Sequence, residues 1–233
     1  MSEELLLDGG AVTDGVVRIG DTVRRPARFD SQLMRDVLVH LERVGFDAAP
    51  RWLGFDEQRR DVLSWIAGDT FTERSQMHPY IGDPAVRITF GGEQVAAAMR
   101  LLRRYHETFG EDVICHGDYG PWNIVWRDGM PFAVIDFDGV YRGAAADDVG
   151  YALRMFVGYG FAAAEPEELL GRTRSALAAY GEEFDVPALL EREYDLAEGR
   201  CRRNGWNRQL ERLAVERAWL ARNRALFDLG DAK

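Results

Sequence analysis

Lysine is almost absent from this chain. Of its 29 lysine and arginine residues only Lys233 is a lysine, so every other cationic side chain of this kind is an arginine. A Walker-type phosphate loop and Schiff-base chemistry both depend on an internal lysine. Both kinds of site are therefore excluded. A cationic side chain that grips nucleotide phosphates here is an arginine.

Cysteine, histidine and long apolar runs are also scarce. Cys115 and Cys201 lack the spacing of metal ligands, and the 4 histidines form no zinc motif. The best apolar run, residues 155–164, is far shorter than the roughly 18 residues that span a bilayer. The first residues lack the basic region of a secretory signal. We expect a cytoplasmic protein without a membrane partner, and Cys115 as a packed side chain rather than a nucleophile.

The overall composition is that of a globular protein. The 233 residues are 46% hydrophobic and 29% charged, which suffices for one large domain or two small lobes. The net charge of -10 gives a pI near 5.0. Arginines are concentrated in residues 199–225, and we expect them to pair with an acidic segment before them rather than with nucleic acid.

One stretch concentrates polar side chains suited to phosphate chemistry. Residues 115–125 read Cys-His-Gly-Asp-Tyr-Gly-Pro-Trp-Asn-Ile-Val, and residues 134–138 read Val-Ile-Asp-Phe-Asp. Asp118, Asn123 and Asp136 in these two runs have the spacing of the kinase catalytic loop H-R-D-x-x-x-x-N and of the D-F-G that follows it. Glycine stands in place of the arginine, and aspartate in place of the last glycine.

The chemistry explains these residue types. An acceptor hydroxyl needs a carboxylate, Asp118, that orients it and takes its proton. Mg²⁺ bound to phosphates prefers oxygen ligands, which the amide of Asn123 and the carboxylate of Asp136 can supply. Each piece alone is usually a turn or a strand cap. Their combination at the correct spacing between apolar strands favours a phosphoryl-transfer site.

These residues make the chain resemble the aminoglycoside phosphotransferase and choline kinase-like enzymes, a small-molecule branch of the protein-kinase fold. The family signature is His-Gly-Asp, four variable residues and Asn, then Ile-Asp-Phe or Ile-Asp-Trp, then an Asp-Leu-Ala-type turn. Residues 148–150, Asp-Val-Gly, stand in for that turn. The resemblance implies Asp118 as catalytic base, Asn123 and Asp136 as Mg²⁺ ligands, and Asp148 as a structural brace of the catalytic loop.

Hydrophobic periodicity predicts two differently built parts. The first part shows three short strands, an amphipathic helix that ends near Gly45, and two more strands, the order of a kinase amino-terminal lobe. From Gln94 onward the chain is mostly helical, with a catalytic hairpin over 113–137. We therefore expect an α+β, protein-kinase-like fold. A reduced amino-terminal lobe would cover residues 1–67, and a helical catalytic and acceptor-binding lobe would cover residues 68–233.

The nucleotide site is expected in the first part. Arg24 lies on the strand where kinases place a phosphate-binding lysine, and a guanidinium can take that role. Arg25 alternates to the other face and is expected to be solvated. If the hinge is used as in the family, backbone groups of Ser64, Trp65 and Ile66 hold the nucleotide base.

Two features of this part depart from the family pattern. The glycine-rich run 9–15 lies where a phosphate-covering turn is expected, but it also fits an ordinary hairpin turn. Family members usually offer a helix glutamate to the lysine, and Met34 occupies that position, with Asp36 and Glu42 nearby. Either one of these acids substitutes for it, or the clamp is absent.

The acceptor site is predicted from charge. Residues 165–198 carry ten acids and three arginines, in a segment where the family binds amino-sugars and choline. The acids either attract a cationic acceptor or form solvated helix faces.

We therefore expect a phosphotransferase that moves the γ-phosphoryl group of ATP or GTP, with Mg²⁺, to a hydroxyl of a small, cationic molecule resembling an aminoglycoside or an amino alcohol. The alternative is a catalytically weak relative that acts as an immunity or binding protein. A protein kinase is disfavoured, because Gly117 replaces the arginine that reads activation-loop phosphate.

Overall fold

The computed structural model describes residues 4–7, 15–27, 31–70, 90–160 and 164–228. The amino-terminal part is a five-stranded antiparallel sheet with the order β1-β2-β3-β5-β4. Its strands are β1 (Leu5–Leu6), β2 (Val17–Ile19), β3 (Thr22–Arg25), β4 (Trp52–Phe55) and β5 (Asp61–Ser64). Three strands, one helix and two strands follow in the predicted order.

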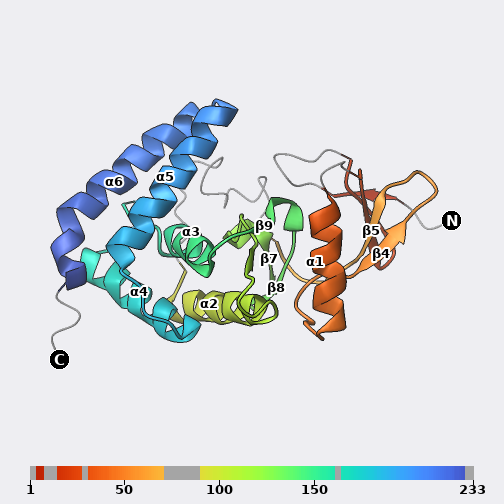
Figure 1. The fold of residues 1–233 in the computed structure, drawn as a ribbon, viewed down its shortest axis with the longest axis horizontal. Helices are drawn as coiled ribbons and strands as arrows, with labels where there is room; N and C mark the ends of the chain where they lie inside the picture. The colour runs from red at the N-terminus through yellow and green to blue at the C-terminus, as the bar shows by residue number, and fades with distance from the viewer. Residues whose placement is uncertain (1–3, 8–14, 28–30, 71–89, 161–163, 229–233) are drawn as a thin grey trace.

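Helix α1 (Gln32–Arg43) covers one face of this sheet and, in Figure 1, lies between the sheet and the rest of the molecule. It forms because apolar residues recur at helical spacing, and Met34, Val37 and Leu38 on this face are all buried. Asp61, fully buried on β5, accepts a hydrogen bond of 2.8 Å from Nε of Arg35. This ion pair fixes α1 on the sheet, and it defines which face of β5 looks toward the helix.

The remainder is mainly helical, as predicted. Its helices are α2 (Gly92–Glu107), α3 (Ala145–Val157), α4 (Pro166–Tyr180), α5 (Val186–Asn204) and α6 (Asn207–Asp228). Figure 1 shows α5 and α6 side by side as a long hairpin. Together with β1–β5 and α1, these helices confirm the α+β class. No helix among the described residues is long and apolar enough to cross a membrane.

Two small two-stranded sheets carry the candidate site. Strand β6 (Ile114–Cys115) pairs with β9 (Tyr141–Arg142), and β7 (Ile124–Arg127) pairs with β8 (Met130–Val134). The loop after β6 and the loop after β8 hold the two polar motifs. Both loops therefore leave strands whose backbones are fixed by neighbouring strands, which suits side chains that must be positioned accurately.

The two parts are joined by more than the chain connection. Phe46 and Ala48, which follow α1, belong to the same buried apolar cluster as Tyr105 of α2 and Phe137. The backbone N–H of Val134 donates to the carbonyl of Ala48 at 2.9 Å. This contact places the segment after α1 next to the end of β8, where the second motif begins.

Candidate active site

The catalytic loop is held from behind by α3. The Asp148 carboxylate accepts hydrogen bonds from the backbone N–H of His116 at 2.6 Å and of Gly117 at 2.9 Å. Nε2 of His106 lies 3.1 Å from the same carboxylate, and Asp148 is almost fully buried. A buried carboxylate that engages two backbone donors fixes the loop rigidly. This is the structural brace that the resemblance implied.

Gly117 explains how the two loops come so close. Its φ of 78° lies in the left-handed region, and a Cβ placed on it would stand 2.2 Å from the carbonyl oxygen of Gly139. Any side chain here, including the arginine of the protein-kinase loop, would force the loops apart. The glycine therefore lets the catalytic loop rest on the loop that follows Asp136.

Asp118 lies between these supports, and both of its carboxylate oxygens are engaged. Oδ2 accepts from the amide of Asn123 at 2.8 Å and from the indole N–H of Trp122 at 3.2 Å. Oδ1 accepts from the hydroxyl of Tyr151, which comes from α3. The predicted base is thus oriented on one side by its own loop, and its second oxygen faces α3.

Asn123 and Asp136 lie close together because their strands pair. Ile124 stands opposite Val134, and the N–H of Ile135 donates to the carbonyl of Asn123 at 2.9 Å. Asp136 has φ 62° and ψ 67°, a left-handed conformation that costs free energy for a residue with a side chain and that is common at functional sites. Two of the three predicted catalytic and metal residues are therefore adjacent, and the Asn123–Asp118 hydrogen bond brings in the third.

These groups fit a magnesium ion. The Asp136 side chain is 46% exposed, so its carboxylate can accept a ligand. The Asn123 amide nitrogen is used on Asp118, and this orientation leaves the amide oxygen to act as a hard ligand. Among the described residues, no group of three or more histidine, cysteine or acidic side chains forms another metal site.

Arg25 corrects the expected strand register. We expected it to be solvated, but it is 6% exposed, and its guanidinium pairs with Asp138 and lies 3.6 Å from Asp136. The reason is strand pairing: Arg25 stands opposite Asp61, whose side chain meets Arg35 of α1, and paired residues of antiparallel strands share a face. Arg25 therefore points toward α1 and the metal loop.

Arg24 lies on the opposite face. Its Nε is 3.7 Å from Oδ2 of Asp56, and it also donates to the hydroxyl of Thr22. Both partners belong to the amino-terminal sheet and its turn. Arg24, which was predicted to bind phosphate, therefore lies away from the loop of Asp136, whereas Arg25 on the same strand reaches that loop.

The clamp glutamate of the first helix has no equivalent on α1. Met34 is buried in the core. Asp36 accepts from Nε2 of Gln32 at 2.8 Å, and Glu42 lies 3.8 Å from Arg51. Of the two alternatives, substitution by a nearby acid and absence of the clamp, the described residues favour the second. The anionic partners of Arg25 come from the metal loop instead.

The expected hinge donors are partly used within the protein. The N–H of Ser64 donates to the carbonyl of Arg51 and that of Trp65 to the carbonyl of Asp21, each at 2.9 Å. Ile66 is partly buried beside the apolar core. Most of the glycine-rich run, residues 9–14, lies outside the described residues.

The acidic segment is largely neutralised by ion pairs. Asp185 caps α5 by accepting from the N–H of Ala188. Arginines pair with Glu168, Glu182, Glu191, Glu193, Asp195 and Glu198. Several of these arginines lie in residues 199–225, so the expected pairing of the basic with the acidic segment is confirmed.

Other features bear on what the sequence revealed. Burial raises the pKa of Cys115 to about 12, so a thiolate is disfavoured and the packed-side-chain interpretation is confirmed.

Tyr151, which contacts Asp118, was not predicted from the sequence. It lies 33 positions beyond Asp118, and its one signal was its place directly after the Asp148 turn.

Comparison with known proteins shows which proteins this chain is similar to. Residues 90–190 match a family model that is described as "phosphotransferase enzyme family". A trifolitoxin immunity protein from Rhizobium leguminosarum bv. trifolii is 33% identical over 161 residues, which are 59% of this chain and 56% of that protein. The chain thus matches little more than half the length of this curated relative.

Solved structures show a similar fold. The ternary complex of streptomycin, ATP and APH(2")-IIa has a TM-score of 0.55 at 11% identity, covering 92% of this chain and 91% of that one. The ADP-bound aminoglycoside phosphotransferase APH(2'')-Ib gives 0.50 at 13% identity, with 93% of each chain covered. The protein-kinase-like fold, with a β-rich amino-terminal and a mainly helical carboxy-terminal part, is therefore confirmed, and the match of residues 90–190 confirms the resemblance to the phosphotransferase enzyme family.

Proposed function

We propose that this protein transfers the γ-phosphoryl group of ATP or GTP to a hydroxyl of a small molecule in the cytoplasm. The observation that carries the proposal is the position of Asp118, whose carboxylate is oriented by Asn123 and stands beside the loop of Asp136. A fixed carboxylate can orient an acceptor hydroxyl and take its proton as the oxygen attacks phosphorus. Orientation of this kind supplies much of the rate enhancement in phosphoryl transfer.

Asn123 and Asp136 would hold Mg²⁺, which neutralises charge on the nucleotide phosphates when it is bound. Arg25 is the cationic side chain that we assign to these phosphates, in place of Arg24, because it lies within 3.6 Å of Asp136. A guanidinium can bind phosphate oxygens in a bidentate manner, so the near absence of lysine does not oppose this role. For the nucleotide base we propose the backbone of residues 64–66.

The chemistry of the acceptor is less constrained than that of the donor. Enzymes of similar fold have been solved with streptomycin and with gentamicin, which agrees with a small-molecule acceptor. The expectation that the acceptor is cationic depended on the acids of residues 165–198. Because arginines pair with many of them, these acids no longer support that charge.

A second function is favoured by one observation. The relative with 33% identity is an immunity protein, and an immunity protein can act by binding alone. The two functions differ in turnover, because a binding protein requires neither a base nor a metal. The intact set of Asp118, Asn123 and Asp136 supports the enzyme more than the binding protein.

Nucleotide binding with and without Mg²⁺ tests the donor side of the proposal. We expect Asp136→Ala to abolish the Mg²⁺-dependent part of ATP or GTP binding, measured by isothermal titration calorimetry, because the metal loses its carboxylate ligand. Asp128→Ala is the matched control. Asp128 is exposed in the β7–β8 turn and also has a positive φ, 51° against 62° for Asp136, so both substitutions change backbone strain similarly. Equal binding by the two variants would place the metal elsewhere.

A further inference from the structure

The hydrogen bond from Tyr151 to Asp118 differs in origin from the other bonds to this carboxylate. Oδ2 of Asp118 accepts from the amide of Asn123 at 2.8 Å and from the indole of Trp122 at 3.2 Å, and both donors belong to the same loop as Asp118. Oδ1 accepts from the hydroxyl of Tyr151, which comes from α3. The carboxylate is therefore held from two separate elements of the fold.

The second anchor matters because the torsion χ2 of an aspartate is soft. Its energy changes little over a wide range of angles. Donors on Oδ2 alone hold one oxygen in place, and the carboxylate can still tilt about it. A donor on Oδ1 from outside the loop restricts this motion. The Tyr151 hydroxyl therefore fixes the direction in which Asp118 presents its remaining lone pairs.

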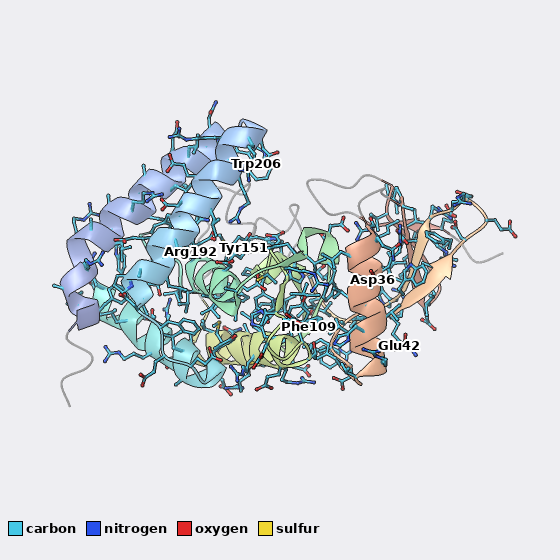
Figure 2. All side chains as sticks on the ribbon, in the orientation of Figure 1. Asp36, Glu42, Phe109, Tyr151, Arg192 and Trp206 are labelled. Atoms are coloured by element: carbon cyan, nitrogen blue, oxygen red, sulfur yellow. The ribbon has the colours of Figure 1, made fainter. Side chains whose placement is uncertain are left out.

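Tyr151 is itself held firmly. The residue is 8% exposed, and the guanidinium carbon of Arg200 on α5 lies 5.4 Å from the centre of its ring, within the range of a cation–π contact. Arg200 in turn donates to the buried Glu193 at 2.9 Å. Figure 2 labels Tyr151 on α3, the helix that lies between α5 and the small sheets beside the catalytic loop. A packed side chain of this kind can position another accurately.

Helix α3 contacts three consecutive residues of the catalytic loop. Asp148 accepts from the backbone N–H groups of His116 and Gly117, and Tyr151 donates to the next residue, Asp118. Side chains three positions apart lie on the same face of a helix, so Asp148 and Tyr151 point to the same loop. Asp148 fixes the backbone of the loop, and Tyr151 fixes the side chain that acts in the reaction.

Resting on the proposed phosphotransferase function, we propose that Tyr151 is a positioning residue, whose hydroxyl holds the carboxylate of Asp118 in the orientation that phosphoryl transfer requires. Its effect passes through Asp118 and not through the nucleotide, whose contacts we assign to the sheet and the metal loop. A misplacement of about 1 Å in a reacting group can cost about 100-fold in rate. Loss of the hydroxyl is therefore expected in kcat, with nucleotide affinity unchanged.

A substitution that removes only the hydroxyl tests this role. Tyr151→Phe keeps the ring and its contact with Arg200, and we expect it to lower kcat by about 10- to 100-fold without changing the Kd of Mg-nucleotide. Turnover is measured as labelled γ-phosphate of ATP or GTP that is released to water, which requires no assigned acceptor. Equal kcat in Tyr151→Phe and in the wild type would overturn the inference.

Tyr159→Phe is the matched control. Tyr159 is almost fully buried, it follows α3 directly, and its hydroxyl lies 2.6 Å from the hydroxyl of Thr173. This variant also loses one buried hydrogen bond, but not one to the catalytic loop. Both variants should therefore unfold at similar temperatures, while Tyr159→Phe keeps the kcat of the wild type. An equal loss of kcat in both would show a general effect of stability and contradict the positioning role.

The indole of Trp122 reports on Asp118 without any turnover. Its N–H donates to Oδ2 of Asp118, and its ring lies so close to Gly120 that a Cβ added there would stand 2.4 Å from it. A change in the carboxylate therefore shifts the ¹H–¹⁵N resonance of this indole. Among the 6 tryptophans the resonance is identified by its absence in Trp122→Phe. We expect it to shift in Tyr151→Phe and to keep its wild-type position in Tyr159→Phe.

The two measurements separate this inference from the phosphotransferase function. A wild-type protein that neither binds Mg-nucleotide nor releases phosphate would overturn that function, and the indole resonance would still show whether Tyr151 orients Asp118. An unshifted indole resonance in folded Tyr151→Phe would overturn the positioning role, whatever the turnover of the wild type. A shifted resonance together with a lower kcat and an unchanged nucleotide Kd is the result that the inference predicts.

Discussion

Arg25 connects the amino-terminal sheet with the loop that carries Asp136. Its guanidinium pairs with Asp138 and lies 3.6 Å from Asp136, while its side chain is only 8% exposed. A buried guanidinium with carboxylates as partners is held firmly, and it can exchange one anionic partner for a phosphate. In a chain whose one lysine is Lys233, we propose that Arg25 provides the charge that kinases draw from a lysine.

The adjacent residues Arg25 and Arg24 allow a direct test of the proposed phosphate contact. We expect Arg25→Ala to weaken Mg-nucleotide binding by about 1.5 to 3 kcal/mol, the range for hydrogen bonds to charged groups. Arg24→Ala should change it little, because Arg24 lies beside Asp56 on the other face of the sheet. Fluorescence or calorimetric titration gives both values. A larger effect from Arg24 would mean that the strand register argued from Asp61 is wrong.

The sequence predicted the positions of some site residues but not of others. The sequence could predict that Asp118, Asn123 and Asp136 lie close together, because one loop and one hairpin fix their spacing. The position of Arg25 could not be predicted. The alternation of side chains along a strand separates its two faces but does not show which face meets the candidate active site. That choice depends on Asp61, buried against α1, and on a pairing between distant strands.

At the scale of elements, α3 supports the site and α5 supports α3. Asp148 of α3 holds the catalytic loop, and Arg154 of the same helix reaches Glu193 on α5 and Glu216 on α6. All three charged side chains of this cluster are nearly inaccessible to solvent. Burial is the largest influence on the Glu193 carboxyl and raises its pKa, against the opposing effect of Arg200 and Arg154. The cluster is therefore stable only while the arginines are present.

Removal of the central arginine should be costly. We expect Arg154→Met to lower the free energy of unfolding by about 3 to 5 kcal/mol, because Glu193 and Glu216 lose a shared buried partner. Arg222→Met, at an exposed position of α6, is the control and should change it by less than about 0.5 kcal/mol. Urea denaturation followed by circular dichroism measures both. Similar midpoints for the two variants would show that the cluster contributes nothing to stability.

Helices were predictable from the sequence because apolar spacing, caps and glycines mark them. The segment 166–180, for example, starts at a proline and stops before Gly181, as α4 does. The partners of the charged residues were harder to predict. The acids of residues 165–198 suggested a binding surface, but several of their arginine partners come from α2 and α6, which helix packing brings beside them.

For the whole molecule, the sheet with α1 and the helical part meet at the candidate active site. The Arg25–Asp138 pair and the Val134–Ala48 hydrogen bond both cross between the two parts. Phosphoryl transfer needs a donor and an acceptor held on opposite sides of one reacting phosphorus. The proposed phosphate contact, Arg25, comes from the sheet, whereas Asp118 belongs to the helical part and is held against α3 by Tyr151.

Transfer of labelled γ-phosphate from ATP or GTP, in the presence of Mg²⁺ and hydroxyl acceptors, tests the central claim most directly. The wild-type protein should form labelled product. Asp118→Asn should lower turnover by about 10²- to 10⁴-fold while nucleotide affinity stays nearly unchanged, because the base acts on the acceptor. Asp112→Asn, an exposed aspartate before the same loop, should behave as the wild type. Turnover by Asp118→Asn equal to that of Asp112→Asn would contradict the account.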